Sequence, residues 1–376
     1  MMWMMLLFLL VYLGSNVWVF LQTLRWLDRL MGQGGMPLWG SVVLGLFFLL
    51  AAFALPLTLL LRESAVPDIL MRALHYLGSI WLVWLVIMLV LLLVVPYPLA
   101  LGLTTLVLIG GYLNFRHNAV HTVPIGPTGI VQTGEGNDKD EEQVSGTRIL
   151  LLSDVHLGYG TGKRALERHL DKIASLQPDL ILIAGDLIDN SLKPVNHQQL
   201  DRLLARLSAP LGVYAVPGNH EYISGIEACE AFYAKTPITL LRDSVVVLDN
   251  GWQLIGRDDR SNRQRKPLSA LMEQTCPDRP VILMDHQPYE LARTDEAGVW
   301  LHVYGHTHNG QLWPLTLLIR RMYEQGHGYR KWPHSHAYVC SGTSLWGPPF
   351  RIGTRGEYVL LEVNNLQQVN NPQPKE

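Results

Sequence analysis

The first 115 residues contain very little charge. No lysine occurs before Lys139, and the stretch from Tyr76 to Phe115 has no charged side chain at all. A soluble domain carries roughly one charged residue in four, so this half of the chain is not an ordinary soluble domain. Its charged residues form two short patches and are Arg25, Asp28, Arg29, Arg62, Glu63, Asp68 and Arg72.

Cysteine is also scarce. The chain of 376 residues has Cys229, Cys276 and Cys340, with no CxxC pair among them. This excludes a disulfide framework and a thiolate zinc site. The formal net charge of -2 lacks the basic excess that favours nucleic-acid binding, so we expect no nucleic-acid partner.

The uncharged runs match the lengths of membrane spans. A transmembrane helix needs about 20 apolar residues for a core about 30 Å thick, and 76–115 as one helix would be about 60 Å long. Pro96 and Pro98 break that run into two. We predict a transmembrane anchor over 1–116 with about four helices, the first being the weakest because Gly14, Ser15 and Asn16 interrupt it: 2–23, 37–61, 76–95 and 99–115.

The alternative for this half is a signal peptide followed by a buried helical domain. The start, "MMWMMLLFLL", lacks the basic residues of a signal peptide, and 79–95 lacks a polar face. With four spans, three arginines (Arg62, Arg72, Arg116) fall on the side of the C-terminal half and two (Arg25, Arg29) on the other. The positive-inside rule then favours a multi-pass cell-membrane protein with a cytoplasmic C-terminal half; a three-span count would reopen this orientation.

The second half reads as one folded unit over 117–365. Helical spacing over 163–176 and 196–207 alternates with short apolar runs, which indicates an α/β core with parallel strands. The segments 244–257, 337–345 and 355–364 are typical of antiparallel strands. Residues 132–146 form an expected flexible acidic insert, and 366–376 an expected polar tail. The five apolar runs are "RILLLSD", "DLILIAGD", "GVYAVPGN", "RPVILMDH" and "VWLHVYGH".

Each of these runs ends in polar residues of metal-ligand type. Taken singly, such residues have ordinary explanations: a helix cap, a turn, a satisfied edge histidine. Because strands of an α/β sheet carry their sites at the carboxyl ends, five such tips together favour one shared site. The tips are Asp154 with His156, Asp186, Asn219 with His220, Asp285 with His286, and His306 with His308.

The tips lie in five blocks that resemble those of the calcineurin-like metallophosphoesterase family, in the same order: "SDVH", "GDLID", "GNHE", "MDHQP" and "GHTH". The longer "GHTHNGQLWP" resembles the membrane-attached bacterial branch, with Asn309 where that branch usually has glycine. The resemblance implies a four-layer αββα domain, a mixed β-sandwich with outer helices. It also implies two divalent metal ions, and the mixed His, Asp and Asn donors suit Mn, Fe or Zn.

The resemblance also assigns roles. His220 would contact phosphate and protonate the leaving group, and Asp189 would orient His220, unless Asp189 only caps a helix. Asn190 stands where the phosphoprotein phosphatases have arginine, which argues against that activity. His306 and His308 would face the same way along an extended stretch. The first metal would take Asp154, His156, Asp186 and His308, and the second Asp186, Asn219, His286 and His306.

These features together predict a membrane-anchored phosphoesterase. A metal-bridging hydroxide would attack a phosphate ester or pyrophosphate, and the bilayer makes a lipid-linked substrate one candidate beside a phosphorylated small molecule. UDP-diacylglucosamine hydrolases share the five blocks. The alternatives are a non-catalytic membrane sensor or scaffold, and a transporter with a regulatory soluble half, which the near absence of ionisable residues in the spans disfavours. The aromatic, basic segment 320–334 would cover the site, touch lipid headgroups or be a solvated loop. The sequence indicates no oligomeric state.

Overall fold

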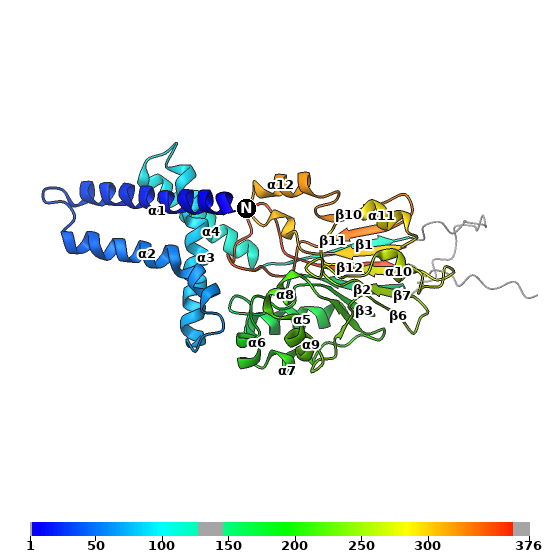
Figure 1. Cartoon of the computed structure of the whole chain (residues 1–376). Helices are drawn as coiled ribbons and strands as arrows, with labels where there is room; N and C mark the ends of the chain where they lie inside the picture. The colour runs from blue at the N-terminus through cyan, green and yellow to red at the C-terminus, as the bar shows by residue number, and fades with distance from the viewer. Residues whose placement is uncertain (1, 127–145, 364–376) are drawn as a thin grey trace, which may run out of the picture.

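The computed structural model describes residues 2–126 and 146–363. Four long apolar helices come first, and a mixed α/β unit built on two sheets follows, as Figure 1 shows. Apart from residue 146, the acidic insert expected over 132–146 lies outside the described residues, and so does the polar tail expected over 366–376.

All four N-terminal helices are long and apolar enough to cross a bilayer, which confirms the predicted four-helix region. Pro96 directly precedes the fourth helix and Pro98 lies in its first turn, where proline's missing N–H has no helical partner to lose. The helices are α1 (Met2–Met31), α2 (Leu38–Leu60), α3 (Asp68–Leu91) and α4 (Tyr97–Phe115).

α1 runs without a break through Gly14, Ser15 and Asn16, contrary to the predicted weak point. Ser15 Oγ and Asn16 Nδ2 donate to backbone carbonyls four residues earlier, at 2.7 and 2.9 Å. Asn16 Oδ1 in turn accepts a 2.9 Å hydrogen bond from the Trp81 indole of α3. These polar groups are therefore satisfied inside the helix bundle and do not interrupt it.

α3 begins at Asp68, well before the third span predicted from 76. Its first three turns meet the α/β unit: Tyr76 Oη donates to the Gly160 carbonyl at 2.9 Å, and Asp68 Oδ2 lies 2.8 Å from His197 Nδ1. An apolar window misses these turns because they carry the polar residues Asp68, Arg72 and His75.

α2 and α3 pack most closely at Gly78. A Cβ atom at this position would lie 2.2 Å from the Leu55 backbone nitrogen, so only glycine permits this approach. Nearby, the Phe48 and Trp81 rings meet edge to face with centroids 4.6 Å apart. The two helices therefore share a tight, aromatic-lined contact.

The first sheet has six strands in the order β1-β12-β2-β3-β4-β5. Strands β2 to β5 run parallel, β12 is antiparallel to β2, and β1 is parallel to β12. The strands are β1 (Ala119–Ile125), β12 (Glu357–Val363), β2 (Thr147–Leu152), β3 (Leu180–Ala184), β4 (Val213–Val216) and β5 (Thr239–Leu240).

The second sheet has the order β10-β11-β9-β8-β7-β6. The hairpin of β6 and β7 is antiparallel, as expected from 244–257. β11, expected to be antiparallel, pairs parallel with β9 and antiparallel only with β10. The strands are β10 (Gly328–Lys331), β11 (His336–Val339), β9 (Leu301–Tyr304), β8 (Val281–Met284), β7 (Gln253–Gly256) and β6 (Ser244–Val247).

Side chains at alternate positions of each strand point to opposite faces of the sheet and so pack in different layers. In β2, Leu151 packs between the two sheets, together with Met284 of β8, whereas Leu150 packs outward against α5. Leu283 of β8 faces the other outer layer. The unit is thus helix, sheet, sheet, helix, which confirms the predicted four-layer fold. Its helices are α5 (Lys163–Leu176), α6 (Lys193–His197), α7 (Leu200–Leu204), α8 (Asn219–Ser224), α9 (Ile226–Tyr233), α10 (Leu268–Met272), α11 (Leu291–Glu296) and α12 (Leu315–Met322).

The carboxyl ends of the central strands face the four helices. A small cavity at this junction is lined by Thr58 and His75 on the side of the helices and by Asp189 in the segment after β3. Hydrogen bonds hold the two parts together: Asn114 Nδ2 of α4 donates to the Thr354 carbonyl at 2.7 Å, and Lys193 Nζ donates to the Val66 carbonyl at 3.0 Å. The strand tips therefore lie next to the apolar helices.

The close approach at Gly78 generates a stability prediction. We expect Gly78→Leu to lower the free energy of unfolding in detergent by at least about 1–3 kcal/mol, because the side chain must displace the α2 backbone. Gly102→Leu is the matched control, since a Cβ at Gly102 meets nothing within 4 Å. Thermal unfolding followed by tryptophan fluorescence measures both, and equal midpoints for the two variants would contradict this packing.

Candidate metal centre

Three groups of possible metal ligands form in the described part of the chain. His156, Asp189 and His220, which include the predicted catalytic pair, make up one of them, and the predicted metal ligands make up two. One comprises Asp154, His156 and His308, and the other Asp186, His286 and His306. Within each group, one ligand atom from every residue lies within 4.8 Å of the others. The structure thus brings together six of the seven predicted metal ligands.

The first group is held at short range. His308 Nε2 lies 3.4 Å from Asp154 Oδ1 and 3.3 Å from His156 Nε2. Burial lowers the pKa of His308 to about 3, so its imidazole is neutral at pH 7. Neutral imidazole is the form that binds metal.

The second group includes the seventh predicted ligand, Asn219. Its Oδ1 lies 3.2 Å from His286 Nε2, and the same nitrogen lies 3.1 Å from Asp186 Oδ2. His286 Nδ1 contacts the Ala184 carbonyl at 2.8 Å, which makes Nδ1 the donor and aims Nε2 at the site. Burial lowers the pKa of His306 to about 4, so this imidazole too is neutral at pH 7.

Asp186 lies between the two groups. Its Oδ2 is 3.1 Å from His286 Nε2 and 3.9 Å from His156 Nε2. Burial opposes ionisation of this carboxyl, but His286 outweighs burial and lowers its pKa well below the ordinary value. An ionised carboxylate in this position faces both groups at once.

Five of the seven predicted ligands have a left-handed backbone: Asp154, His156, Asp186, His306 and His308, with φ between 49 and 71°. Such values are uncommon outside glycine and gather at functional sites. The expectation that His306 and His308 lie along an extended stretch was wrong. A turn separates them, and His308 begins a short 3-10 helix over His308–Gly310, so each histidine joins a different group.

Two glycines allow the backbone to approach the carboxylates. A Cβ at Gly218 would lie 2.1 Å from Asp186 Oδ1, and one at Gly305 would lie 2.6 Å from Asp154 Oδ2. Any side chain at either position would displace a candidate ligand. This is the physical reason for glycine in "GNH" and in "GHTH".

Glu221 is a site residue to which sequence reasoning gave no role. Its buried carboxylate accepts hydrogen bonds from the backbone N–H groups of Asp186 (3.1 Å), Ile188 (3.0 Å) and Gly218 (2.7 Å). Burial, reinforced by the nearby Asp186 carboxylate, raises its pKa to about 7. Glu221 thereby ties the loop after β3 to the loop after β4. The sequence could have indicated a role for Glu221, because it directly follows Asn219 and His220.

Arg351 is a second such residue, with no motif around it. Its buried guanidinium donates to the carbonyls of His308 (3.0 Å), Ser341 (2.6 Å), Gly342 (3.1 Å) and Ser344 (3.2 Å). It therefore fixes the turn that carries His308.

Asp285 is a strand tip that stays outside both groups. Its Oδ2 pairs with Arg265 at 2.6 Å and with Arg257 at 3.3 Å. The two guanidinium groups balance the charge of this buried carboxylate without any metal.

The predicted catalytic pair lies beside the first group. His220 Nδ1 is 3.1 Å from Asp189 Oδ1, and His156 also lies within reach of this carboxylate at 3.6 Å. Burial lowers the pKa of His220, but Asp189 and Asp186 outweigh it and raise the pKa to about 9. α6 begins only at Lys193, after Leu192, so Asp189 does not cap that helix.

The remaining histidines outside the five blocks have packing or surface roles. The segment 320–334 contains the end of α12 and the edge strand β10, and its Gly326 carbonyl accepts a hydrogen bond from Thr307 Oγ1, between His306 and His308, at 2.7 Å. Contacts of these histidines include His169 with Tyr358 Oη (2.6 Å), His302 with Ser335 Oγ (3.0 Å), His327 with Glu357 (3.1 Å) and His336 with Tyr329 Oη (2.7 Å).

The donor set fits divalent metal ions. Imidazole nitrogens, carboxylate oxygens and one amide oxygen converge in buried positions, and mixed N and O donors of this kind suit Mn, Fe or Zn better than Ca or Mg. The Nδ1 atoms of His156 and His308 have no hydrogen-bond partner among the described residues.

Comparisons with known proteins agree with this geometry. Residues 147–310 match the family described as calcineurin-like phosphoesterase. An uncharacterized metallophosphoesterase of Helicobacter pylori is 33% identical over 222 residues, covering 57% of this chain and 59% of that protein. A transmembrane protein with metallophosphoesterase domain from Danio rerio is 31% identical over 247 residues, covering 61% and 56%. The match therefore spans less than two thirds of either relative.

Among solved structures, the crystal structure of a 5'-nucleotidase precursor from Thermus thermophilus aligns with a TM-score of 0.37 at 16% identity, covering 57% of this chain and 54% of that one. A likeness this slight carries no argument about activity.

The first site prediction concerns metal content. We expect the purified wild-type chain to bind two divalent ions, and Asp186→Asn to weaken binding at least about 100-fold, because both groups lose a ligand. Elemental analysis after dialysis against Mn measures this. The surface change Asp171→Asn is the control, and an Asp186→Asn protein that retains both ions would exclude the shared carboxylate.

The second site prediction concerns pH. In metal-free protein His220 should titrate near pH 9, and Asp189→Asn should bring it back towards 6.5. Because the folded pKa is raised, the stabilisation is complete below about pH 6.5 and is lost as the pH rises through 9. NMR of 13C-labelled histidine measures the midpoint. His302, whose pKa burial lowers to about 3, should not titrate in this range. A His220 midpoint near 6.5 in the wild type would rule out the pairing with Asp189.

Proposed function

Because the chain belongs, through residues 147–310, to the calcineurin-like metallophosphoesterase family, we propose that it is a membrane-anchored, metal-dependent hydrolase of phosphate esters or pyrophosphates. The observation that carries this proposal is the pair of buried His and Asp groups on either side of Asp186. When bound, two metal ions would activate a water and offset the charge of the phosphate.

We assign the ligands as two overlapping sets. Asp154, His156, Asp186 and His308 hold one ion. Asp186, Asn219, His286 and His306 hold the other. The distances within each group and the shared reach of Asp186 support this assignment.

His220 is the proposed proton donor to the leaving group. It is cationic at neutral pH because of its contact with Asp189, so it carries a proton to give. Asp189 keeps its ring in place, and the backbone N–H of His220 donates to Asp186 Oδ1 at 2.9 Å. The Trp346 ring, 44% exposed, lies 6.1 Å from the His220 ring, centroid to centroid, and offers an apolar wall to a leaving group.

A lipid-linked substrate is the class we favour. Asp189 lies at the ends of the apolar helices, where it shares with Thr58 and His75 a cavity of about 20 Å³, room for no more than a water molecule, so the proposed centre borders these helices directly. On the other side of the centre, α12 starts shortly after the His308 turn and exposes Leu315, Leu317 and Leu318 above Arg320 and Arg321. An amphipathic helix of this composition lies in a membrane interface. Both borders of the proposed centre therefore favour an amphiphile.

We further propose that the catalytic unit faces the cytoplasm. The end of α2, the start of α3 and the end of α4 all lie against this unit. Arg62, Arg72 and Arg116 occupy this side, while Arg25 and Arg29 approach the opposite loop. The excess of arginine on the catalytic side agrees with the positive-inside rule.

Hydrolysis of bis-p-nitrophenyl phosphate by detergent-solubilised protein with Mn tests the activity. We expect Asp186→Asn and His308→Ala each to lower kcat/KM at least about 100-fold, because each removes a metal ligand. His334→Ala, on the exposed surface, is the control and should match the wild type. An inactive wild type that contains metal, or equal turnover by all variants, would favour a non-catalytic sensor or scaffold.

His220→Ala separates proton donation from metal binding. The variant should keep its metal, and its kcat should fall more for an alkyl phosphate ester than for a p-nitrophenyl ester, since p-nitrophenolate needs less protonation to leave. Equal losses for both esters would leave His220 with a structural role only.

A further inference from the structure

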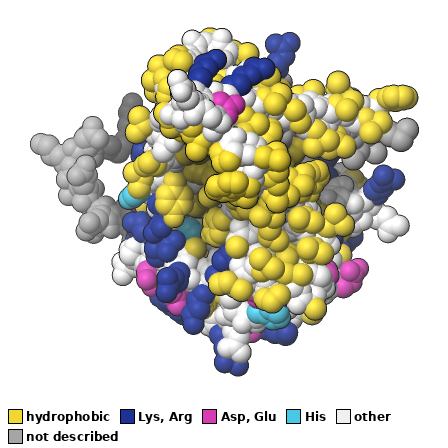
Figure 2. All heavy atoms as spheres, turned by 90° about the vertical axis from the view of Figure 1, so that its left-hand side faces the viewer, with side chains coloured by type: hydrophobic (Ala, Val, Ile, Leu, Met, Phe, Trp, Pro, Cys, Tyr) yellow, Lys and Arg dark blue, Asp and Glu magenta, His cyan; other side chains and the backbone are white. Residues whose placement is uncertain are grey.

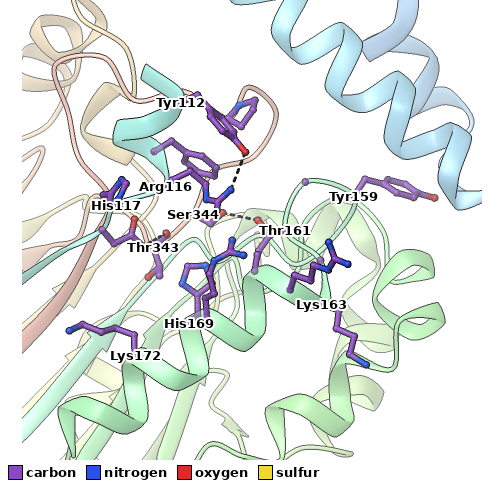
Figure 3. A pocket seen from close by; sticks show the side chains of 18 of the residues that line it. Tyr112, Arg116, His117, Tyr159, Thr161, Lys163, His169, Lys172, Thr343 and Ser344 are labelled. Carbon is purple, nitrogen blue, oxygen red and sulfur yellow. Dashed lines mark hydrogen bonds between the residues drawn. The ribbon is translucent and has the colours of Figure 1, made fainter. Parts of the chain in front are cut away.

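A second cavity lies outside the metal centre, where the apolar helices meet the catalytic unit. It has a volume of about 810 Å³ and is formed by the start of α3, the end of α4 and the first turns of α5 (Figure 3). None of the residues assigned above as metal ligand or catalytic residue lines it. Its wall towards the centre contains the hydrogen bond between Thr161 Oγ1 and Ser344 Oγ, at 2.7 Å.

The cavity is strongly cationic. No Asp or Glu lines it, although acidic residues slightly outnumber basic ones in the whole chain, 32 to 30. Viewed from the side of the helices, Lys and Arg side chains gather below the apolar surface (Figure 2). The six basic residues that line the cavity are Arg72, Arg116, Lys163, Arg164, Arg168 and Lys172.

These six cations lack anionic partners. Within the described residues, none of them lies within 4 Å of a carboxylate, whereas Arg242, Arg257 and Arg265 all form ion pairs. Part of Arg72 is buried, and its Nε has no hydrogen-bond partner in the described part of the chain. Like charges around one space repel unless an anion lies between them.

The position of the cavity identifies the source of such an anion. Arg72 and Tyr76 belong to the first turns of α3, and Tyr112 and Arg116 to the end of α4. Helix ends with tyrosine and arginine lie at the level of lipid headgroups. The Tyr112 hydroxyl accepts a hydrogen bond from Arg116 Nη1 at 3.2 Å, and guanidinium groups bind phosphate through paired N–H donors.

We propose that this cavity binds the phosphate of an anionic lipid headgroup. The site is separate from hydrolysis: Ser344, in its wall, reaches the metal centre only through its backbone. Its N–H donates to the Asp154 carbonyl at 3.0 Å, and its carbonyl accepts a hydrogen bond from Arg351 at 3.2 Å. The lipid occupies the junction and fastens the catalytic unit to the bilayer. The proposal therefore stands whether or not the protein is an enzyme.

Native mass spectrometry of the full chain in detergent tests this binding. We expect phosphatidylglycerol to bind saturably, with one tight site per chain, and phosphatidylcholine not to compete. The triple variant R116Q/K163Q/R168Q should bind phosphatidylglycerol roughly 100-fold more weakly, since each lost charge weakens attraction to an anionic lipid several-fold. Thermal unfolding of each variant without lipid checks that it is folded.

The matched control is R202Q/K235Q/R279Q, which removes three exposed charges that do not line the cavity. Its affinity for phosphatidylglycerol should stay within about threefold of the wild type, since distant exposed charges are screened. If both triple variants lose affinity for phosphatidylglycerol equally, the loss reflects net charge alone. If the cavity variant binds the lipid as tightly as the wild type, the lipid binds elsewhere. Either result overturns the proposal. Inorganic phosphate that displaces phosphatidylglycerol at micromolar concentration would make free phosphate the ligand and reject a lipid source.

Discussion

The carboxylate of Asp186, held between two groups of histidines, is the constraint on which the rest of the catalytic unit depends. A buried carboxylate is unstable unless donors or cations surround it. The His220 backbone N–H and the His286 ring supply part of that compensation. Glu221 positions the Asp186 backbone, and Gly218 leaves room for its side chain. The loops after β3, β4 and β8 are thus shaped around one side chain.

Neither sheet alone contains either of the two groups of predicted metal ligands. Asp154, His156 and Asp186 follow strands of the first sheet, whereas His286, His306 and His308 follow strands of the second. Each of the two groups of predicted metal ligands takes members from both sheets. Metal bound at such a junction stabilises the packing of one sheet on the other, because the complete donor set exists only when both sheets are folded together. The apolar core between the sheets and the polar groups at their edge therefore depend on one another.

Much of this arrangement could be predicted from the sequence, because it follows from local patterns. Uncharged runs gave the four helices, and apolar runs with polar tips gave the central strands and the residues that converge. Features that depend on distant contacts could not be found this way. Arg351 binds carbonyls from two separate segments. The left-handed turn at His306 and His308 replaced the expected extended stretch. The early start of α3 brings Asp68 to His197, a contact with a residue far along the chain.

α3 connects the bilayer to both functional regions. His75 packs beside the segment after β2, where a Cβ at Gly160 would lie 3.2 Å from its Nε2, and it lines the same small cavity as Asp189. Arg72, one helical turn earlier, lines the cationic cavity. A helix moves as a unit over so short a distance, so whatever fixes Arg72 also fixes His75. An anion held by Arg72 would therefore restrain the contact beside Asp189. The same helix that anchors the chain then sets the position of the α/β unit relative to the headgroups, which is the geometry that the proposed hydrolysis of a lipid-linked substrate would require.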